Sequence, residues 1–323
     1  KQGFDTFVGY LDQHHAHNYY PTFLIKNGER FSLPNVVPGE GDFGQGVATE
    51  KRQYSHDVIM EAAMKWLDDN HDQRFFLYLP ITLPHANNEA KQEGMEIPSY
   101  GSYANKDWPE PQKGTAAMIS RIDTDMGQLF KKLKEYGIDE DTIVFFTSDN
   151  GPHREGGNNP DFFDSNGPLR GIKRDLYEGG IRVPMIVRWP GKTNPGTRSA
   201  HIGYHGDLLA TSAELAGVEP PAGLDSVSFV PAILGNANDQ KEHEFLYWEF
   251  YERAFKQGVR AGDWKYVKVN DKEELYNLAD DLAEENDLAK KHPDQLARLR
   301  TMAEQAHVPS PRWDKELKPR KKN

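Results

Sequence analysis

The spacing of hydrophobic positions in the first part of the chain predicts two amphipathic helices. Apolar residues recur every three or four positions over residues 55–69, and Ser55 is a candidate N-cap for this helix. The same periodicity runs from Ala116 to Leu133, and Gly137 follows it as a C-terminal stop. Each helix therefore has one apolar face that needs a partner to cover it.

Three short apolar runs, at residues 75–79, 142–147 and 183–189, predict buried strands. A further helix is expected over residues 207–215, with Asp207 as its cap. This alternation of strands and helices predicts an α/β fold with a parallel or mixed sheet flanked by helices. In such folds, functional residues gather beyond the carboxyl ends of the strands.

The pattern changes after about residue 235, where short strands follow one another and end in a helix. The strands are expected at residues 245–250, 256–260, 265–269 and 274–278, and the helix at 293–306. We therefore expect a larger domain at residues 1–235 and a smaller α+β domain, an antiparallel sheet plus a helix, at 236–323. Residues 151–168, rich in Gly, Asn, Asp and Pro, predict a long functional loop.

Composition narrows the possible functions. The 323 residues carry 39 Lys and Arg against 50 Asp and Glu, a net charge of −11, which argues against binding to nucleic acid. The apolar runs fall far short of the roughly 18 residues that suggest a membrane span. With no cysteine in the chain, disulfides, thiolate metal sites and an encoded thiol nucleophile are excluded.

The candidate metal ligands are Asp149 and Asn150, which follow the apolar run at residues 142–147. A carboxylate and an amide oxygen are the hard donors that calcium and magnesium prefer. An Asp-Asn-Gly sequence after a strand is also a common turn. Because calcium takes about six to eight oxygens, these two ligands need partners from elsewhere.

Four further residues are candidates for catalysis or substrate binding. His85 is suited to proton transfer or anion binding, although a hydrogen-bonded loop histidine is equally compatible with its position. Arg170 and Lys173 flank a glycine, an arrangement that suits a tetrahedral anion or two solvated cations. His153, in the long loop, is placed to meet a substrate.

His14, His15 and His17 form a short histidine-rich run. It is compatible with a transition-metal site or, because tyrosines follow it, with a packed loop that borders a pocket. Together with Asn87 and Asn88, such a pocket would suit a sugar.

Three motifs occur in an order and at separations that resemble one enzyme family. They are residues 145–151 (FFTSDNG), 169–173 (LRGIK) and 177–184 (YEGGIRVP), with further matches at 3–10, 84–85 and 262–278. The chain resembles the C-terminal part of the formylglycine-dependent sulfatases of the arylsulfatase A-like type. That resemblance covers almost the whole chain and implies an alkaline-phosphatase-like fold.

The resemblance also implies roles for single residues. Asp149 and Asn150 match ligands of one calcium ion, and His85 and Lys173 match residues that contact the sulfate group during catalysis. Residues 178–180 match a motif expected to give structural support. A sulfated small molecule or glycan is the implied substrate, and a periplasmic or secreted location the implied compartment.

The chain departs from the family pattern in one respect. It contains no Cys/Ser-x-Pro-x-Arg motif, whose first residue becomes the formylglycine nucleophile, and it lacks the family's N-terminal Asp pair. We therefore expect a missing N-terminal segment to supply both, and the present chain alone to be inactive. Two alternatives stay open: a phosphoryl hydrolase of related architecture, and a noncatalytic protein that binds glycans or anions.

Overall fold

The computed structural model describes residues 3–311, which form two compact units. Within the described range, one unit consists of residues 3–139 with His153–Ser165, and the other of Glu140–Pro152 with residues 166–311. The domain boundary expected near residue 235 is a different division of the chain and stays a prediction. Each unit is described by itself.

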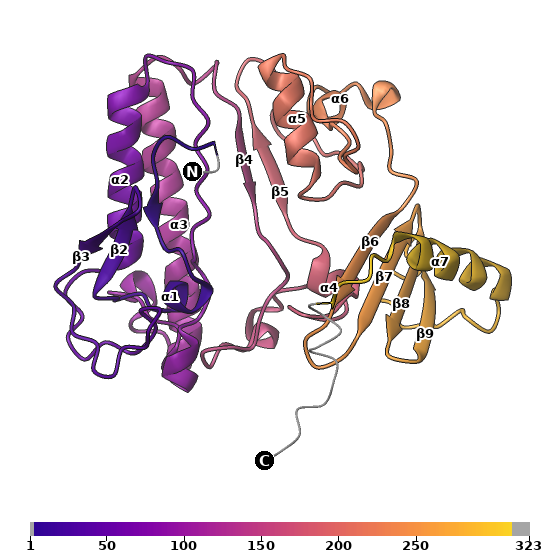
Figure 1. The fold of residues 1–323 in the computed structure, drawn as a ribbon, viewed down its shortest axis with the longest axis horizontal. Coiled ribbons are helices and arrows are strands. Elements are labelled where there is room, and N and C mark those ends of the chain that lie inside the picture. Colours follow the sequence, from indigo (N-terminus) through magenta and orange to yellow (C-terminus); the bar gives the residue numbers. More distant parts are fainter. Residues whose placement is uncertain (1–2, 312–323) are drawn as a thin grey trace. The chain divides into compact units, whose positions relative to one another are not determined.

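Two long helices dominate the first unit and lie side by side (Figure 1). They are α2 (Ser55–Asn70) and α3 (Glu110–Glu135). His56 on α2 contacts the Asp125 carboxylate on α3 at 2.7 Å. Both predicted helices are confirmed, but α3 begins earlier than expected, with a proline in its first turn. Ser55 is not the N-cap, because Tyr54 holds that position and the Ser55 hydroxyl donates to the Tyr19 carbonyl at 3.0 Å.

Short elements complete the first unit. They are β1 (Val8–Gly9), α1 (Gln13–His17), β2 (Phe23–Lys26), β3 (Glu29–Ser32) and the 3-10 helices η1 (Asn88–Glu93), η2 (Gly101–Tyr103) and η3 (Pro160–Phe163). The three strands form an antiparallel sheet. Buried aromatic residues lie at the centre of the unit, with Tyr19, Tyr20 and Tyr54 packed against Met118 of α3. The predicted long loop contains η3.

The apolar run at residues 75–79 does not form the buried strand that we expected. Phe76 is 65% exposed and Tyr78 is 62% exposed, whereas the alternate positions Phe75 and Leu77 are partly buried. The run has the two-residue alternation of a strand, but a strand also needs a neighbour for its main-chain hydrogen bonds. No described residue provides that pairing.

In the second unit, the strands expected at residues 142–147 and 183–189 are confirmed in shortened form. β4 (Val144–Thr147) pairs with β5 (Met185–Arg188) in antiparallel register, with Phe145 opposite Val187. One face of this two-stranded ribbon is poorly covered, since Ile186 is 59% exposed.

Three α-helices come between β4 and the C-terminal sheet in the described part of this unit. They are α4 (Glu178–Ile181), α5 (Asp207–Ala216) and α6 (Val230–Ile233). Asp207 begins α5 rather than capping it, because Gly206 is the N-cap and the Asp207 carboxylate accepts from the Tyr204 and Val227 main-chain N–H groups.

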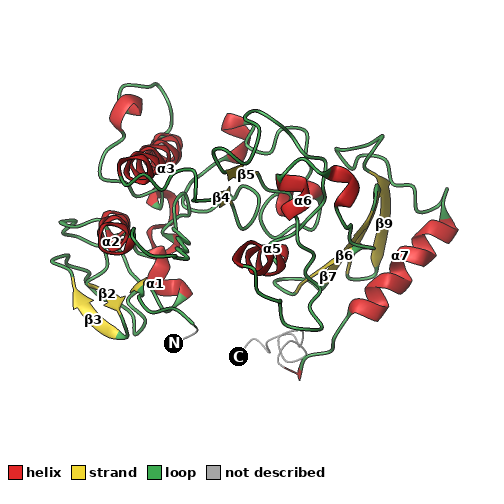
Figure 2. Cartoon of the chain, turned by 90° about the horizontal axis from the view of Figure 1, so that it is seen from above, coloured by secondary structure: helices red, strands yellow, loops and turns green. Residues whose placement is uncertain are grey.

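The C-terminal meander and its helix are confirmed. The elements are η4 (Ala237–Asp239), β6 (Leu246–Phe250), β7 (Lys256–Ala261), β8 (Trp264–Val269), β9 (Lys272–Asn277) and α7 (Pro293–Ala306). The four strands pair in sequence order, each antiparallel to the next. Helix α7 lies along one face of this sheet (Figure 2), where Leu299 and Met302 pack against Val259 and Tyr266. Over residues 3–311, no helix is long and apolar enough to cross a membrane.

Candidate functional site

Three histidine rings stack on one another in the first unit. The centroids of His17 and His85 are 5.3 Å apart with an angle of 8° between the rings, and those of His85 and His153 are 5.6 Å apart with an angle of 28°. These residues come from α1, from the segment before η1 and from the long loop. The structure thus brings the predicted residues His85 and His153 together, and we call the three rings the histidine stack.

Glu155 faces the central ring of the histidine stack. Its Oε2 atom lies 3.4 Å from His85 Nε2 and 3.9 Å from His153 Nδ1. The other nitrogen of His85, Nδ1, lies 2.8 Å from the Ala86 carbonyl oxygen. Both ring nitrogens of His85 therefore face oxygen acceptors, one from the main chain and one from a carboxylate.

His153 is held in one neutral form by its own loop. Its Nδ1 atom accepts from the Glu155 main-chain N–H at 3.1 Å, so the ring proton lies on Nε2, which donates to the Pro84 carbonyl at 3.2 Å. Both nitrogens therefore have main-chain partners. This geometry supports a role in packing against His85, and the expected contact with a substrate stays a prediction.

A hydrogen bond from the Tyr19 side chain fixes the main chain of His85. The buried Tyr19 hydroxyl donates to the His85 carbonyl oxygen at 2.5 Å. Burial raises the pKa of Tyr19 well above its usual value, so this hydroxyl keeps its proton. The tyrosine-rich segment after the histidine run therefore positions His85.

In the second unit, Asp149 and Asn150 directly follow β4, as expected. Asp149 is exposed, and the Asn150 amide nitrogen donates to the Gly151 carbonyl at 2.9 Å, which leaves its Oδ1 atom as an acceptor. Gly151 donates its N–H to the Gly180 carbonyl at 3.0 Å. A Cβ atom at Gly151 would lie 1.8 Å from the Gly179 carbonyl oxygen, so only glycine fits here.

Lys173 belongs to the segment that contacts this turn. Its main-chain N–H donates to the Pro152 carbonyl at 2.8 Å, and the segment is held in turn by the Gly179 N–H, which donates to the Arg170 carbonyl at 2.7 Å. The structure thus brings Lys173 beside the turn that carries Asp149 and Asn150. His85 belongs to the other unit, and its expected approach to Lys173 stays a prediction.

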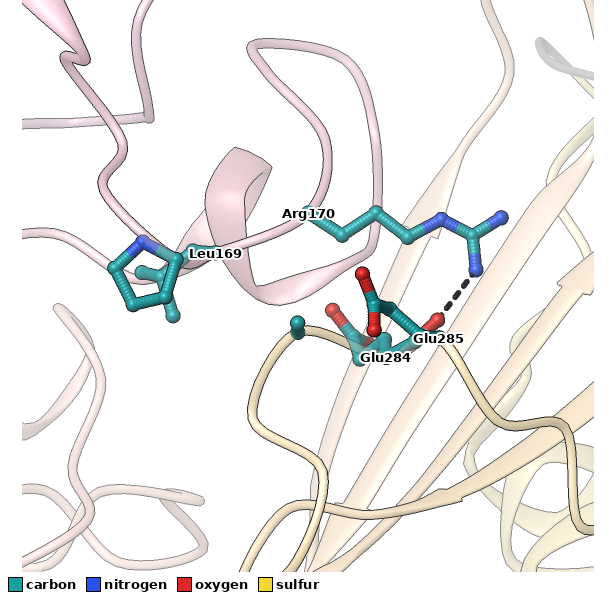
Figure 3. A pocket seen from close by; sticks show the side chains of 6 residues that line it. Leu169, Arg170, Glu284 and Glu285 are labelled. Atoms are coloured by element: carbon teal, nitrogen blue, oxygen red, sulfur yellow. Dashed lines mark hydrogen bonds between the residues drawn. The ribbon is translucent and has the colours of Figure 1, made fainter.

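The Arg170 side chain contacts the C-terminal sheet. Its guanidinium donates to the Tyr276 hydroxyl at 2.9 Å and to the Glu284 carbonyl at 2.7 Å, and it stacks 3.9 Å from the centroid of the Tyr177 ring. A cavity of about 500 Å³ opens beside it (Figure 3). Its walls are Pro168, Leu169, Arg170, Ala283, Glu284 and Glu285. These contacts attach the Lys173 segment to the sheet, and substrate binding by Arg170 stays a prediction.

Glu178, in the motif expected to give support, is the centre of a buried charge cluster. Its carboxylate lies 2.9 Å from the ammonium of Lys265, which is 0% exposed, and 2.9 Å from the Arg260 guanidinium. Burial favours the neutral acid, but these two cations outweigh it and lower the pKa of Glu178. The structure places this motif in the interior, as a supporting role requires.

Glu284 is a second carboxyl group in the same interior. One of its oxygens accepts from the Glu178 N–H at 2.7 Å, whereas the other is buried without a hydrogen-bond partner among the described residues. Burial raises the pKa of Glu284 to about 7. Neither Glu284 nor Glu155 was identified from the sequence, because a single glutamate in a polar loop carries no distinguishing pattern.

The donor set at Asp149 and Asn150 fits part of a calcium site. It offers one carboxylate and one amide oxygen, both hard donors. Elsewhere in residues 3–311, no cluster of three or more His, Asp or Glu side chains is arranged to hold a metal ion. The histidine run forms the short helix α1, in which His15 is buried with its Nε2 atom 3.0 Å from the Phe23 carbonyl oxygen. Its expected place at the border of a pocket stays a prediction.

Two family models and several known proteins match this chain. The family model described as Sulfatase matches residues 1–218, and the model described as N-sulphoglucosamine sulphohydrolase, C-terminal, matches residues 172–307. The chain is 34% identical to rat (Rattus norvegicus) steryl-sulfatase over 193 residues, which cover 58% of this chain and 31% of that enzyme.

Two other proteins match a larger share of the chain. It is 27% identical to N-acetylgalactosamine-6-O-sulfatase of Bacteroides thetaiotaomicron over 303 residues, which cover 86% of this chain and 56% of that enzyme. The crystal structure of Ps i-CgsB in complex with k-i-k-neocarrahexaose superposes with a TM-score of 0.72 at 24% identity, covering 99% of this chain and 72% of that one.

These matches confirm the alkaline-phosphatase-like α/β fold with its C-terminal sheet and helix. The chain spans 31% and 56% of the lengths of these two curated relatives. Because the sulfatase model matches two thirds of its residues, in the region that holds His85, Asp149, Asn150 and Lys173, the chain belongs to the sulfatase family.

Proposed function

We propose that this chain forms the C-terminal part of an enzyme that hydrolyses sulfate monoesters of carbohydrates. The main support is the main-chain hydrogen bond from Lys173 to Pro152, which holds the motif at residues 169–173 beside the turn of Asp149 and Asn150 after β4. The named activity of the Bacteroides relative and the oligosaccharide bound to Ps i-CgsB favour a sulfated glycan as the substrate.

In the proposed reaction, this chain supplies a positive charge for the sulfate group and a proton for the leaving group. A sulfate monoester is cleaved when the charge on its oxygens is neutralised and the departing alkoxide is protonated. The Lys173 ammonium group would neutralise one sulfate oxygen. His85 would donate the Nε2 proton to the leaving oxygen, and Glu155 would keep the ring charged until the proton is transferred.

Two groups outside this chain complete the proposal. Asp149 and Asn150 would hold a calcium ion, which when bound supplies Lewis-acid charge to the sulfate oxygens. A formylglycine in a preceding segment would supply the nucleophile, because the chain contains no Cys/Ser-x-Pro-x-Arg motif. The family resemblance also leads us to propose a periplasmic or secreted location, which cell fractionation would test.

The test compares turnover of 4-nitrophenyl sulfate and 4-nitrophenyl phosphate by the full-length protein, with calcium and with a chelator. We expect calcium-dependent hydrolysis of the sulfate ester. Lys173→Ala should lower kcat by about 100-fold, because it removes a charge that neutralises the transition state. Lys192→Ala, at an exposed lysine of the same unit, should leave kcat unchanged.

Three results would contradict the proposal. Preferential turnover of the phosphate ester would favour the phosphoryl hydrolase. Retention of a sulfated glycan with no turnover of either ester would favour the noncatalytic binding protein. Equal kcat values for Lys173→Ala and Lys192→Ala would show that Lys173 takes no part in catalysis.

A further inference from the structure

We propose that His17 is a positioning residue for His85, whose ring it keeps in the plane from which Nε2 can transfer a proton. This inference rests on the proposed function, because it concerns the geometry of the acid in that reaction. The centroids of the two rings are 5.3 Å apart, and the rings lie within 8° of parallel. Helix α1 and the segment before η1, which are far apart in the sequence, meet in this contact.

The torsion that sets the plane of the His85 ring is soft by itself. The χ2 angle of histidine has broad minima, so the surroundings of the ring decide its plane. The polar contacts of the ring, 2.8 Å from Nδ1 to the Ala86 carbonyl oxygen and 3.4 Å from Nε2 to Glu155 Oε2, tolerate a tilt. His153 packs at an angle of 28°, whereas His17 is nearly parallel. The flat contact with His17 therefore defines the plane most closely.

His17 is itself held firmly enough to act as a support. Its side chain is only 9% exposed, and its Nδ1 atom lies 3.3 Å from Glu89 Oε1. Its Nε2 atom lies 3.5 Å from Asn88 Nδ2, and the ring of His14 packs edge-on against it at 6.0 Å. Because the ring is already fixed by these neighbours, it loses little further freedom when it packs against His85.

The orientation of His85 matters because proton transfer is directional. An acid must lie within hydrogen-bond reach of the leaving oxygen and point along that bond. A ring that tilts away transfers its proton more slowly, and a basic leaving oxygen suffers most from the delay. His17 touches neither the sulfate nor the leaving oxygen in the proposed reaction, so its effect on kcat passes through His85.

Two substitutions separate the flat ring of His17 from its polar contact with Glu89. His17→Phe keeps a flat ring that can pack on His85 but loses the nitrogen that faces Glu89. His17→Gln keeps a polar group that can reach Glu89 but has no ring. The matched control is His205→Gln, the same substitution at an exposed histidine of the second unit.

The kinetic test compares two aryl sulfates in the full-length protein. The anion that leaves 4-nitrophenyl sulfate is stable and needs little help from an acid, whereas phenyl sulfate releases a more basic oxygen. We expect His17→Gln to lower kcat for phenyl sulfate by about tenfold and for 4-nitrophenyl sulfate by less than about threefold, with KM near the wild-type value. His17→Phe and His205→Gln should stay within about threefold of the wild type for both esters. Partial unfolding lowers both rates by the same factor, so the ratio of the two rates reports on the acid.

A second measurement tests the ring contact without any turnover. The Cε1–H resonance of His85, assigned with His85→Gln, is sensitive to an aromatic ring on its face. We expect His17→Gln to shift this resonance and His205→Gln to leave it unchanged.

Three results would overturn the inference. They are an unshifted His85 resonance in His17→Gln, a change in kcat for that variant that is absent or equal for both esters, and a kcat of His17→Phe as low as that of His17→Gln. A shifted resonance in a protein that hydrolyses neither ester would instead refute only the proposed hydrolysis.

Discussion

At the scale of single residues, the orientation of His85 depends on two oxygen acceptors. The main-chain carbonyl of Ala86 lies beside Nδ1, and the Glu155 carboxylate faces Nε2, the nitrogen that would transfer the proton. Glu155 touches neither the sulfate nor the leaving group in the proposed reaction. It is therefore a positioning residue, which acts through His85.

Glu155→Gln in the full-length enzyme tests this dependence. Replacing the carboxylate by a neutral amide leaves the size of the side chain unchanged but removes the anionic acceptor 3.4 Å from His85 Nε2. We expect kcat for a sugar sulfate, whose alkoxide needs a proton to depart, to fall by about tenfold while KM stays near the wild-type value. The measurement is kcat and KM from pH 5 to 9.

The control for this variant is Glu61→Gln, at an exposed position of α2, which should reproduce the wild-type profile. A Glu155→Gln variant with the kcat of the wild type would mean that the carboxylate does not act through His85.

The sequence identified some of these residues and missed others for a physical reason. Asp149 and Asn150 were found because a continuous apolar run predicts a strand, and the polar residues after it must lie at its carboxyl end. Glu155 and Glu89 act through contacts with histidines of other segments. No local pattern encodes such contacts, which exist only after the long loop and η1 have folded.

At the scale of elements, α4 supports the Lys173 segment through buried charge. Glu178 at the start of α4 pairs with Lys265 of β8 and Arg260 of β7, and Arg170 reaches the same sheet. Removing one partner of a buried ion pair costs far more than the pair itself contributes, because an unpaired charge stays behind. The position of the Lys173 segment thus depends on the C-terminal sheet.

Glu284 in this cluster predicts a pH-dependent stability. Its pKa is raised to about 7 by burial, from an unfolded value of 4.5, against the opposing effect of Lys265 and Arg170. Its favourable contribution is complete below pH 4.5 and is lost as the pH rises through 7. Between pH 4.5 and 8, we expect the wild type to lose on the order of 3 kcal/mol of stability relative to Glu284→Gln.

Urea unfolding of both proteins across this pH range measures the difference. Glu178, whose pKa is lowered, contributes with the opposite sign, because its stabilisation is lost only as the pH falls below its unfolded value of 4.5. Glu285→Gln, at the exposed neighbouring carboxylate, is the control and should follow the wild type. Parallel pH profiles for the wild type and Glu284→Gln would contradict the prediction.

The strands also show when a sequence pattern is sufficient to predict an element. The C-terminal meander was predicted strand by strand because each strand pairs with its neighbour in sequence, so local alternation determines the fold. The run at residues 75–79 has the same kind of pattern but no partner among the described residues. When a strand pairs only with a segment distant in sequence, its own alternation of apolar and polar residues is not sufficient to predict that it forms.

At the scale of the whole molecule, exposed apolar side chains lie on both units. Phe76 and Tyr78 are exposed on the unpaired run of the first unit, and Met185 and Ile186 on β5 of the second. Exposed apolar side chains along an unpaired run or on a strand are typical of surfaces that another segment covers. In each unit by itself, they support the proposal that a preceding segment of the same protein packs against these side chains.

This leads to the last prediction, that residues 1–323 expressed alone will not hydrolyse 4-nitrophenyl sulfate and will self-associate. Attack on sulfur needs a nucleophile held near the reacting atom, and this chain offers no residue in the required motif. Uncovered apolar surface favours association, which size-exclusion chromatography detects. Adding the upstream segment should restore both turnover and a monomeric elution volume, and replacing the Cys or Ser of its Cys/Ser-x-Pro-x-Arg motif by Ala should abolish only the turnover. Robust calcium-dependent turnover by residues 1–323 would refute the assignment of the nucleophile, because activity would then have to come from a residue within this chain.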